Sequence, residues 1–422
     1  MKRVFVVFFM VVLMLIPGLV LFAGGAQEQT GAAGKVTLTF WNGFTASDGE
    51  VLRDIVNKFN ADNAGRIEIK MDIMPWAVFY QKLPPALSTG TAPSFIIGGP
   101  RDMMEYVPKG HFQPLDDFFS QTGVKESDFT PTALELCKYE GKYYMLPMQT
   151  FYLILYWNKD LFQDAGLDPE KPPKTWDELA QYAIKVTDPS KAQYGFGIPV
   201  KTAPPYYLSL IWGNGGDLVD LKNKKSVLNS PENVKSFEFM RDAAVNKKVT
   251  PQSVTGPDLD NLLISGKLAM YINGPWLING MKTNNVNFSV TAPPRGTVTQ
   301  NTPLDASTFA VLTKDPEEKK AVYEFLEYWE SLAVGKEWSS RNGFPPYLES
   351  VIADPTIKAD PLLGNQAVLG DIARLALPNL AGSSRIFDDV MFPLIEKVTT
   401  GTETPANAVR AASQQIDDIL KQ

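Results

Sequence analysis

Hydrophobic and polar residues alternate in the first segments that follow residue 34. Residues 35–41 (KVTLTFW) and 66–74 place apolar side chains at every second position, which is the period of a strand with one buried face. Between them, an S-x-x-E capping box at Ser47 precedes apolar residues at helical spacing. The pattern therefore predicts a strand, a helix and a second strand, which is the opening of a parallel sheet.

The rest of the chain continues with short apolar strands and capped helices. A helix is expected over residues 76–88, with a kink or restart at Pro84 and Pro85, because proline removes a backbone donor. Thr175 and Ser230 are expected to cap later helices. The other predicted strands are 94–97, 194–198, 268–272, 287–291 and 309–312, and the other predicted helices are 206–212, 232–246, 316–329 and 405–420. This alternation predicts an α/β fold.

The stretch Tyr143–Phe162 (YYMLPMQTFYLILYWNKDLF) is rich in aromatic residues and contains one proline, Pro147. Residues 151–157 are almost all β-branched, leucine or aromatic, which is typical of a strand buried on both faces. One interpretation is a core strand of a single domain. The other is that the chain crosses here between two lobes. In that case Pro147 ends one sheet, residues 152–158 begin the next, and the aromatic residues at the crossing face a ligand.

The length of the chain, 422 residues, exceeds what one hydrophobic core usually supports, so we expect two domains. The sequence contains no internal repeat, no low-complexity tract and no long linker. Two α/β lobes joined by several crossings fit these observations better than two separate domains in series.

The N-terminus, residues 1–23, is expected to be a signal peptide. It has a basic start, an apolar run over residues 4–20 and a small residue, Ala23, at which cleavage is expected. The run is almost long enough to span a membrane, but Pro17 breaks it before its end. We therefore expect cleavage, and a retained membrane anchor is the alternative.

The net charge limits the possible binding partners, and the cysteine content bears on disulfide bonds and on lipid anchoring. Without the two basic residues of the signal peptide, 38 basic residues face 47 acidic ones, a net charge of −9. No basic stripe is visible, so nucleic acids and anionic membrane surfaces are poor partners. The single cysteine, Cys137, permits no intramolecular disulfide, and no lipid-anchor cysteine follows the apolar run. We expect a periplasmic or otherwise extracytoplasmic protein without a lipid anchor.

Most catalytic and metal-binding motifs are absent from the sequence. It contains one histidine, His111, and no G-x-S-x-G or G-x-x-x-x-G-K-[ST] motif, which argues against Ser-His-Asp catalysis and NTP binding. One histidine and one cysteine also exclude the usual zinc sites. We expect no enzymatic activity, no cofactor and no metal. A secreted polysaccharide-active enzyme stays as an alternative, because 47 acidic residues could supply a pair of catalytic carboxylates.

Aromatic residues recur at the ends of predicted elements, beside glycine or proline. Loops at the ends of strands are where open α/β sheets bind ligands, and an aromatic ring there suits the C–H face of a sugar. Core packing is the alternative for each of these residues taken singly. The residues are Trp41, Trp76, Tyr206, Tyr207, Trp212 and Trp276.

Several short motifs carry a resemblance to a known family over residues 35–420. They are LTFWNGF (38–44), LPPALSTGTAP (83–93), GKYYMLP (141–147) followed by YWNKDLF (156–162), PKTWDEL (173–179), YGF (194–196) and AMYINGPW (269–276). With these motifs the chain resembles the extracellular solute-binding proteins of family 1. These are the carbohydrate-binding subunits of ABC importers, and they include maltose-binding and glycerol-3-phosphate-binding proteins.

The resemblance implies a two-lobed periplasmic-binding-protein fold of type II, with mixed sheets flanked by helices and a ligand cleft at the hinge. It implies an N-terminal lobe of residues 35–147 plus 304–342 and a C-terminal lobe of residues 148–303 plus 343–422. The expected function is to bind a sugar or oligosaccharide between the lobes and to deliver it to the permease subunits of an ABC transporter. The protein is expected to act as a monomer.

The resemblance also implies which residues contact the ligand. Trp76 joins them as an aromatic residue at an element end. The full set is Trp41 and Asn42 in the first-strand loop, Trp76, Asp102 after the third strand, Gln149, Phe151 and Tyr152 in the crossing segment, Tyr206, Trp212 and Asn214 in the second-lobe wall, Gly274 and Trp276 in the Asn-Gly-Pro-Trp motif, and Arg385 in a late loop.

The chain departs from the family pattern at three positions. Ser94 stands where an aspartate is usual, Trp157 where a tyrosine is usual, and Phe151 where a maltose-type protein carries an acid. The aromatic residue in place of the acid at position 151 argues against a maltose-like hydroxyl network and favours a flatter or less polar ligand face. A phosphorylated polyol such as glycerol 3-phosphate is the alternative ligand, because Arg101, Arg295 and Arg385 could bind phosphate in a bidentate manner.

Overall fold

The structure is a computed structural model that describes residues 34–45, 47–367, 369–377, 380 and 382–421. Residues 35–422 form one unit by their contacts. The expected signal peptide, residues 1–23, lies outside the described residues. Within the part of the chain that is described, no helix is both long enough and apolar enough to cross a membrane.

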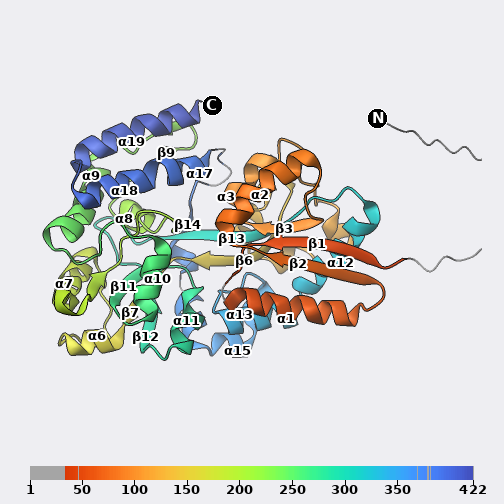
Figure 1. The fold of residues 1–422 in the computed structure, drawn as a ribbon, viewed down its shortest axis with the longest axis horizontal. Helices are drawn as coiled ribbons and strands as arrows, with labels where there is room; N and C mark the ends of the chain where they lie inside the picture. Colours follow the sequence, from red (N-terminus) through yellow and green to blue (C-terminus); the bar gives the residue numbers. More distant parts are fainter. Residues whose placement is uncertain (1–33, 46, 368, 378–379, 381, 422) are drawn as a thin grey trace, which may run out of the picture. The chain divides into compact units, whose positions relative to one another are not determined.

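The first sheet has six strands (Figure 1). The strands are β1 (Val36–Asn42), β2 (Ile67–Ile73), β3 (Phe95–Gly98), β6 (Leu146–Tyr152), β13 (Thr302–Val311) and β14 (Ala373–Leu375). Their order is β14-β13-β3-β1-β2, and β6 also pairs with β13. The pairs β1–β2, β1–β3 and β13–β14 are parallel, whereas β13 runs antiparallel to β3 and β6. The sheet is therefore mixed, as expected.

The alternation in the first strand places Leu38 and Phe40 in the core, where the Phe40 ring stacks on Phe95 with 4.3 Å between centroids. Around the sheet lie α1 (Ser47–Asp62), α2 (Trp76–Thr89), α12 (Pro316–Trp329) and α13 (Leu332–Asn342). The expected restart at Pro84 is wrong, because α2 continues through both prolines, and the expected kink there stays a prediction. Leu83 and Ala86, which flank the two prolines, are buried, so packing on the sheet holds this part of the helix in place.

The second sheet has four strands in the order β12-β7-β11-β8. These are β7 (Ile154–Asn158), β8 (Tyr194–Phe196), β11 (Leu268–Asn273) and β12 (Phe288–Thr291). Every residue of β7 and β11 is buried, which confirms, for residues 154–157, that the apolar stretch forms a strand covered on both faces. The helices of this half include α6 (Lys159–Asp164), α7 (Trp176–Val186), α8 (Leu208–Gly213), α9 (Pro231–Arg241), α10 (Gly256–Ile264) and α11 (Leu277–Thr283).

The chain crosses from the first sheet to the second at Leu153. The expectation that Pro147 ends the first sheet is wrong, because Pro147 lies inside β6, and β6 stays paired with β13 as far as Tyr152. The proline is tolerated there because its position coincides with a register shift between Ser307 and Thr308 of β13. The crossing is thus a single residue, and the aromatic pair Phe151–Tyr152 belongs to the end of the first sheet.

The last third of the chain contributes to both halves. Residues 344–363 are expected in the C-terminal lobe. Several of their side chains, among them Phe344 and Leu363, instead lie in the core of the first sheet. From Leu377 onward, buried side chains belong to the core of the second half. We therefore infer that the last crossing lies between Leu363 and Leu377, near β14.

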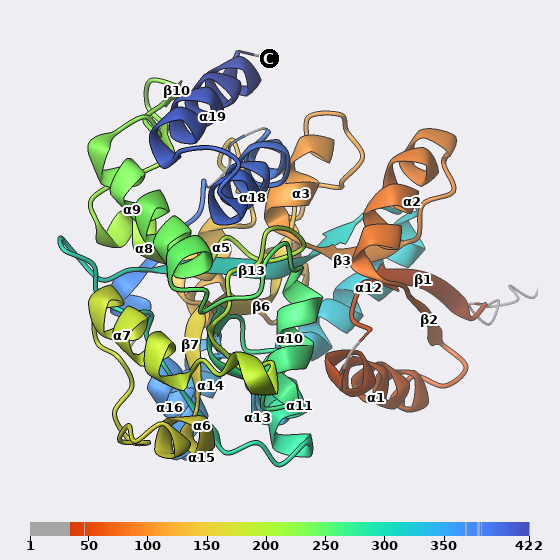
Figure 2. The same ribbon diagram turned by 60° about the vertical axis from the view of Figure 1, so that its left-hand side comes forward.

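The C-terminal helices pack in the second half, beside α9 (Figure 2), and the short segment before them reaches the first half. These C-terminal segments are α17 (Ser383–Arg385), a π-helical segment (Ile386–Met391), α18 (Phe392–Thr400) and α19 (Pro405–Leu420). The α17 segment contacts α3 (Pro100–Met103), which follows β3 of the first sheet. This contact brings late residues of the chain against the edge of the first sheet where its parallel strands end.

Candidate ligand cleft

Asn42 and Trp76 form the first part of the site, at the carboxyl end of β1. Asn42 is fully buried, its Oδ1 accepts a hydrogen bond from the Phe44 amide (3.1 Å), and its Nδ2 has no partner. The Trp76 ring lies directly on Gly43, so close that a Cβ there would be 2.0 Å from the ring. Only glycine fits this approach. Together they provide an aromatic plane beside an amide donor without a partner.

Trp276 repeats this arrangement at the carboxyl end of β11. Asn273 is buried, and its Oδ1 accepts from the Gly274 amide (2.9 Å). A Cβ on Gly274 would lie 1.9 Å from the Trp276 ring. The two halves of the molecule therefore each end a buried strand in Asn-Gly and seat a tryptophan on the glycine. They differ in one respect, because the Nδ2 of Asn273 is taken up by Asp260 (2.8 Å).

Trp276 also lies where the two halves meet. It is partly buried and packs against the cores of both sheets. Its ring meets Phe151 edge to face, with 5.3 Å between centroids. Gln149, two residues earlier in β6, is buried. Its side chain donates a hydrogen bond to Ser307 Oγ (3.3 Å) and accepts one from Trp338 Nε1 (3.0 Å). Phe151 and Tyr152 are therefore the partly exposed members of the crossing segment, whereas Gln149 holds it in place.

Arg101 and Asp102 on α3 connect the two halves. The Asp102 carboxylate accepts a hydrogen bond from the Ser384 hydroxyl on α17. The Arg101 guanidinium carbon lies 4.9 Å from the centroid of the Phe387 ring, which suits a cation–π contact. Its Nε is 3.5 Å from Asp102 Oδ1, without hydrogen-bond geometry. Asp102 therefore already has a partner from the opposite half.

Three carboxylates act electrostatically on the Arg101 guanidinium, and of these Asp102 lies within 4 Å of it. Burial lowers the pKa of Arg101, but the negative charges of Asp102, Asp305 and Asp388 outweigh burial and raise it. Burial raises the pKa of Asp305 and of Asp388, and in both the positive charge of Arg101 acts in the opposite direction. This part of the cleft thus carries an excess of negative charge.

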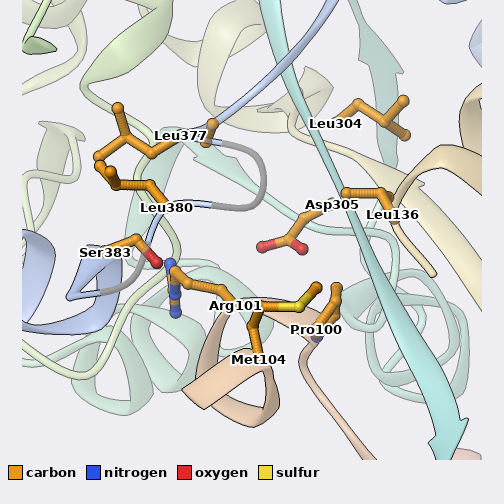
Figure 3. A pocket seen from close by; sticks show the side chains of 10 residues that line it. Pro100, Arg101, Met104, Leu136, Leu304, Asp305, Leu377, Leu380 and Ser383 are labelled. Carbon is orange, nitrogen blue, oxygen red and sulfur yellow. The ribbon is translucent and has the colours of Figure 1, made fainter. Parts of the chain in front are cut away.

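A pocket of about 350 Å³, open solvent included, lies beside Arg101 (Figure 3). Figure 3 shows the Asp305 carboxylate pointing into it and Arg101 extending toward Ser383. The other seven lining residues are apolar, and they come from both halves: Pro100, Met104, Leu136, Leu304, Ala376, Leu377 and Leu380. The pocket is therefore mostly apolar, with a few polar groups that converge at one side.

None of the expected site residues lines this pocket, and five of them have contacts elsewhere in the described part of the chain. Tyr206 is buried and donates to the Pro199 carbonyl (2.9 Å). Trp212 is buried, its Nε1 donates to Asp217, and Arg374 covers its ring at 4.6 Å. Asn214 bonds Ser236 and Thr297, and Arg385 is exposed with its Nε 3.9 Å from Asp389. Trp41, the remaining expected residue, is partly buried, with Lys82 5.3 Å above its ring.

Comparison with known proteins identifies the family. The model of the bacterial extracellular solute-binding protein family matches residues 54–365. The chain belongs to this family. The solute-binding protein is 25% identical to the sn-glycerol-3-phosphate-binding periplasmic protein of Escherichia coli (strain K12), over 94% of each chain. It is also 25% identical to the maltotriose-binding protein of Pyrococcus abyssi, over 80% of this chain and 72% of the relative.

Solved structures confirm the two-lobed fold. An ABC transporter solute-binding protein from Thermotoga lettingae, bound with α-D-tagatose, superposes with a TM-score of 0.80 and 25% identity, over 91% of this chain and all of that one. The cycloalternan complex of a substrate-binding protein from Listeria monocytogenes gives a TM-score of 0.81 at 23% identity, over 92% and 99% of the two chains.

The structure adds site residues of this solute-binding protein that the sequence did not indicate. Asp305 interrupts the apolar pattern of residues 302–311 (TPLDASTFAV), and that single acid was the available signal. Tyr80 stacks on Trp76 with 5.7 Å between centroids and accepts from the Gly99 amide (3.0 Å). It had no signal of its own, because its role depends on the distance between α2 and β3 in space.

Proposed function

We propose that this protein is the extracytoplasmic receptor of an ABC importer and that it binds a neutral carbohydrate between its two lobes. The observation that carries the proposal is the pair of tryptophans, Trp76 and Trp276, each seated on a glycine at the carboxyl end of a buried strand. Flat rings held at such strand ends suit the C–H faces of a sugar. The relatives named for maltotriose and the tagatose complex support the same class of ligand.

The polar groups of the site fit hydroxyl groups. The buried Nδ2 of Asn42 has no partner among the residues that the structure describes, and an unpaired buried donor is costly. A ligand hydroxyl would supply the missing acceptor. Asp102 already has hydrogen bonds with Ser384 and Tyr80, and because a carboxylate has about four acceptor sites it can take a further hydroxyl donor. We infer that Asn42, Asp102, Phe151, Tyr152 and the two tryptophans contact the sugar.

A phosphorylated polyol is the second candidate, supported by the E. coli relative's name. The charges disfavour it. Three carboxylates act electrostatically on Arg101, so that an added phosphate would meet a net negative site. Arg295 donates to the Val298 carbonyl from an exposed loop, and Arg385 lies on the surface near Asp389. We therefore favour the neutral ligand.

Native mass spectrometry of the freshly purified protein, followed by thermal-shift titration, tests the proposal. We expect a retained mass that corresponds to one or a few neutral sugar units, and stabilisation by a member of a panel of neutral mono- and oligosaccharides. Stabilisation by glycerol 3-phosphate without any response to neutral sugars would reject the neutral ligand. Release of reducing ends from oligosaccharides, lost on substitution of Asp102 or Asp305, would reject the assignment as a non-enzymatic receptor.

Neutralising the acids around Arg101 is expected to admit anions. The double substitution Asp305→Asn and Asp388→Asn should strengthen binding of glycerol 3-phosphate by roughly tenfold, because each removed charge makes Arg101 more available to phosphate. Calorimetric titration measures the change. Asp389→Asn is the matched control, since this exposed neighbour of Asp388 does not act on Arg101. Equal anion affinity in wild type and double variant would show that the carboxylates do not exclude phosphate.

The remaining parts of the proposal concern transport. Closure of the two lobes around the ligand is the change that a permease can recognise, and the Arg101–Phe387 and Asp102–Ser384 contacts between the halves suit a closed state. We propose delivery to the permease subunits of an ABC transporter after export by the signal peptide. We also propose that the protein acts as a monomer, with no enzymatic activity and no nucleic-acid partner.

A further inference from the structure

A chain of hydrogen bonds begins at Asp260 on α10 and ends at the turn that carries Trp276. Asp260 Oδ1 accepts from Asn273 Nδ2 (2.8 Å), and Asn273 Oδ1 accepts from the Gly274 amide (2.9 Å). On the other side, the Tyr156 hydroxyl donates to the Gly274 carbonyl (2.7 Å). The turn on which the Trp276 ring is seated is therefore fixed from both sides.

We propose that Asp260 is a positioning residue for ligand binding, whose ionised carboxylate orients the Asn273 amide and thereby the turn that presents Trp276 to the cleft. The inference rests on the proposed function in so far as Trp276 contacts the sugar. The equivalent loop at Asn42 has no such acid, because the Nδ2 of Asn42 is unpartnered. Asp260 therefore gives the second loop a support that the first loop lacks.

The physical reason is the number of donors and acceptors at each group. An ionised carboxylate can only accept, so Asn273 must turn its NH₂ toward Asp260 and its oxygen toward the Gly274 amide. A protonated Asp260 can donate, and this allows the Asn273 amide to turn over. The turned amide would set its NH₂ against the Gly274 N–H, donor against donor, and release the turn.

Both protonation states of Asp260 are accessible near neutral pH. Burial raises the pKa of Asp260 to about 7, although the hydrogen bond from Asn273 lowers it. The titratable groups that face it are Tyr156 of β7 and Tyr271 of β11, both buried, and burial followed by the charge of Asp260 raises the pKa of each. On α10 itself, Asp258 is exposed and caps the helix with Thr255. Lys282, the titratable residue of α11, is exposed.

Tryptophan fluorescence of the ligand-free protein tests the proposal. The spectrum of a Trp276→Phe variant is subtracted from that of the wild type at each pH between 5 and 9, which isolates the signal of Trp276. We expect this difference to titrate with a midpoint within about one pH unit of 7. In Asp260→Asn the titration should vanish, and the signal should resemble that of the wild type at low pH throughout.

Two controls separate Asp260 from other groups. His111→Gln replaces the one histidine of the chain and should leave the midpoint unchanged. Asp305→Asn removes the carboxylate that points into the pocket and should also leave the midpoint unchanged. A Trp276 signal that is flat with pH, or one that still titrates in Asp260→Asn, overturns the proposal. Because no ligand is needed, a failure to bind sugar leaves this result standing and rejects only the proposed function.

Discussion

Replacing Trp276 with alanine is expected to weaken sugar binding by about 1–3 kcal/mol, a rise in Kd of roughly 5- to 150-fold. The Trp276 ring is partly buried, meets Phe151 edge to face and lies on Gly274, and we propose that its exposed part contacts the sugar. Truncation removes both the stacking plane and the apolar area. Isothermal titration with the sugar identified by mass spectrometry measures the loss.

Two substitutions control this experiment. Trp276→Phe retains a ring on Gly274, so most of the affinity should be retained. Trp212→Phe changes a buried tryptophan that is covered by Arg374, so the affinity should stay within about twofold of wild type. Trp276→Ala should also lower the melting temperature, because the ring packs against the cores of both sheets. Unchanged affinity in a folded Trp276→Ala protein would remove this residue from the site.

The fold could be predicted where the pattern of one segment decides its structure. Alternation in residues 35–41 and the capped helices at 316–329 and 405–420 correspond to β1, α12 and α19. The expectation of one strand buried on both faces over residues 151–157 is confirmed for residues 154–157, which lie in β7, whereas Phe151 and Tyr152 end β6 and are partly exposed. In each case the spacing of apolar residues within the segment itself predicts which side chains are buried. Distant segments are not needed for such a prediction.

The pairing partners of a segment could not be predicted in this way. Pro147 looked like the end of a strand, but the register shift in β13, some 160 residues later, accommodates it inside β6. The residues of β13 that precede Phe309 are polar in part, so this strand was expected to be much shorter than it is. Asp305 in that stretch is tolerated because Arg101 lies near it, which only the fold reveals.

The expected site residues differ in the same way: local sequence predicts some of them, and the position of others depends on distant segments. Trp276 was expected from the Asn-Gly-Pro-Trp motif, and its ring does lie on Gly274, whereas Trp76 was expected only as an aromatic residue after Pro75, and the fold places its ring on Gly43. Tyr206 and Trp212 also lie beside glycine or proline, yet they are buried in the second core. Local composition is the same for both kinds of aromatic residue. The difference is whether a neighbouring element covers the ring, as Arg374 covers Trp212.

Replacing Glu330 with glutamine is expected to stabilise the protein, and to do so more strongly as the pH rises. Glu330 is 8% exposed at the end of α12, its Oε2 accepts from the Tyr347 hydroxyl (2.8 Å), and its Oε1 has no partner. Burial raises the pKa of Glu330 well above its ordinary value, although the Tyr347 hydrogen bond lowers it. The folded protein therefore retains a proton that the unfolded chain releases.

The sign of the pH dependence follows from this difference. Below about pH 4.5 both states hold the proton, and the stabilising contribution of the protonated Glu330 is complete. Above that pH the unfolded state loses its proton first, so the free energy of unfolding falls by up to about 1.4 kcal/mol per pH unit until the folded pKa is reached. Glutamine mimics the protonated acid and removes this loss. Melting temperatures of the two proteins should therefore agree near pH 4.5 and separate by several degrees at pH 7.5.

Differential scanning calorimetry between pH 4.5 and 8 measures this separation. Glu135→Gln, which changes an exposed acid of the same half, should show no comparable growth of the difference with pH. A Glu330→Gln protein that is less stable than wild type at every pH would mean that Glu330 is ionised in the fold. Its carboxylate would then need a donor in addition to Tyr347, which the unpartnered Oε1 argues against. The experiment thus tests whether this buried acid is neutral in the folded protein.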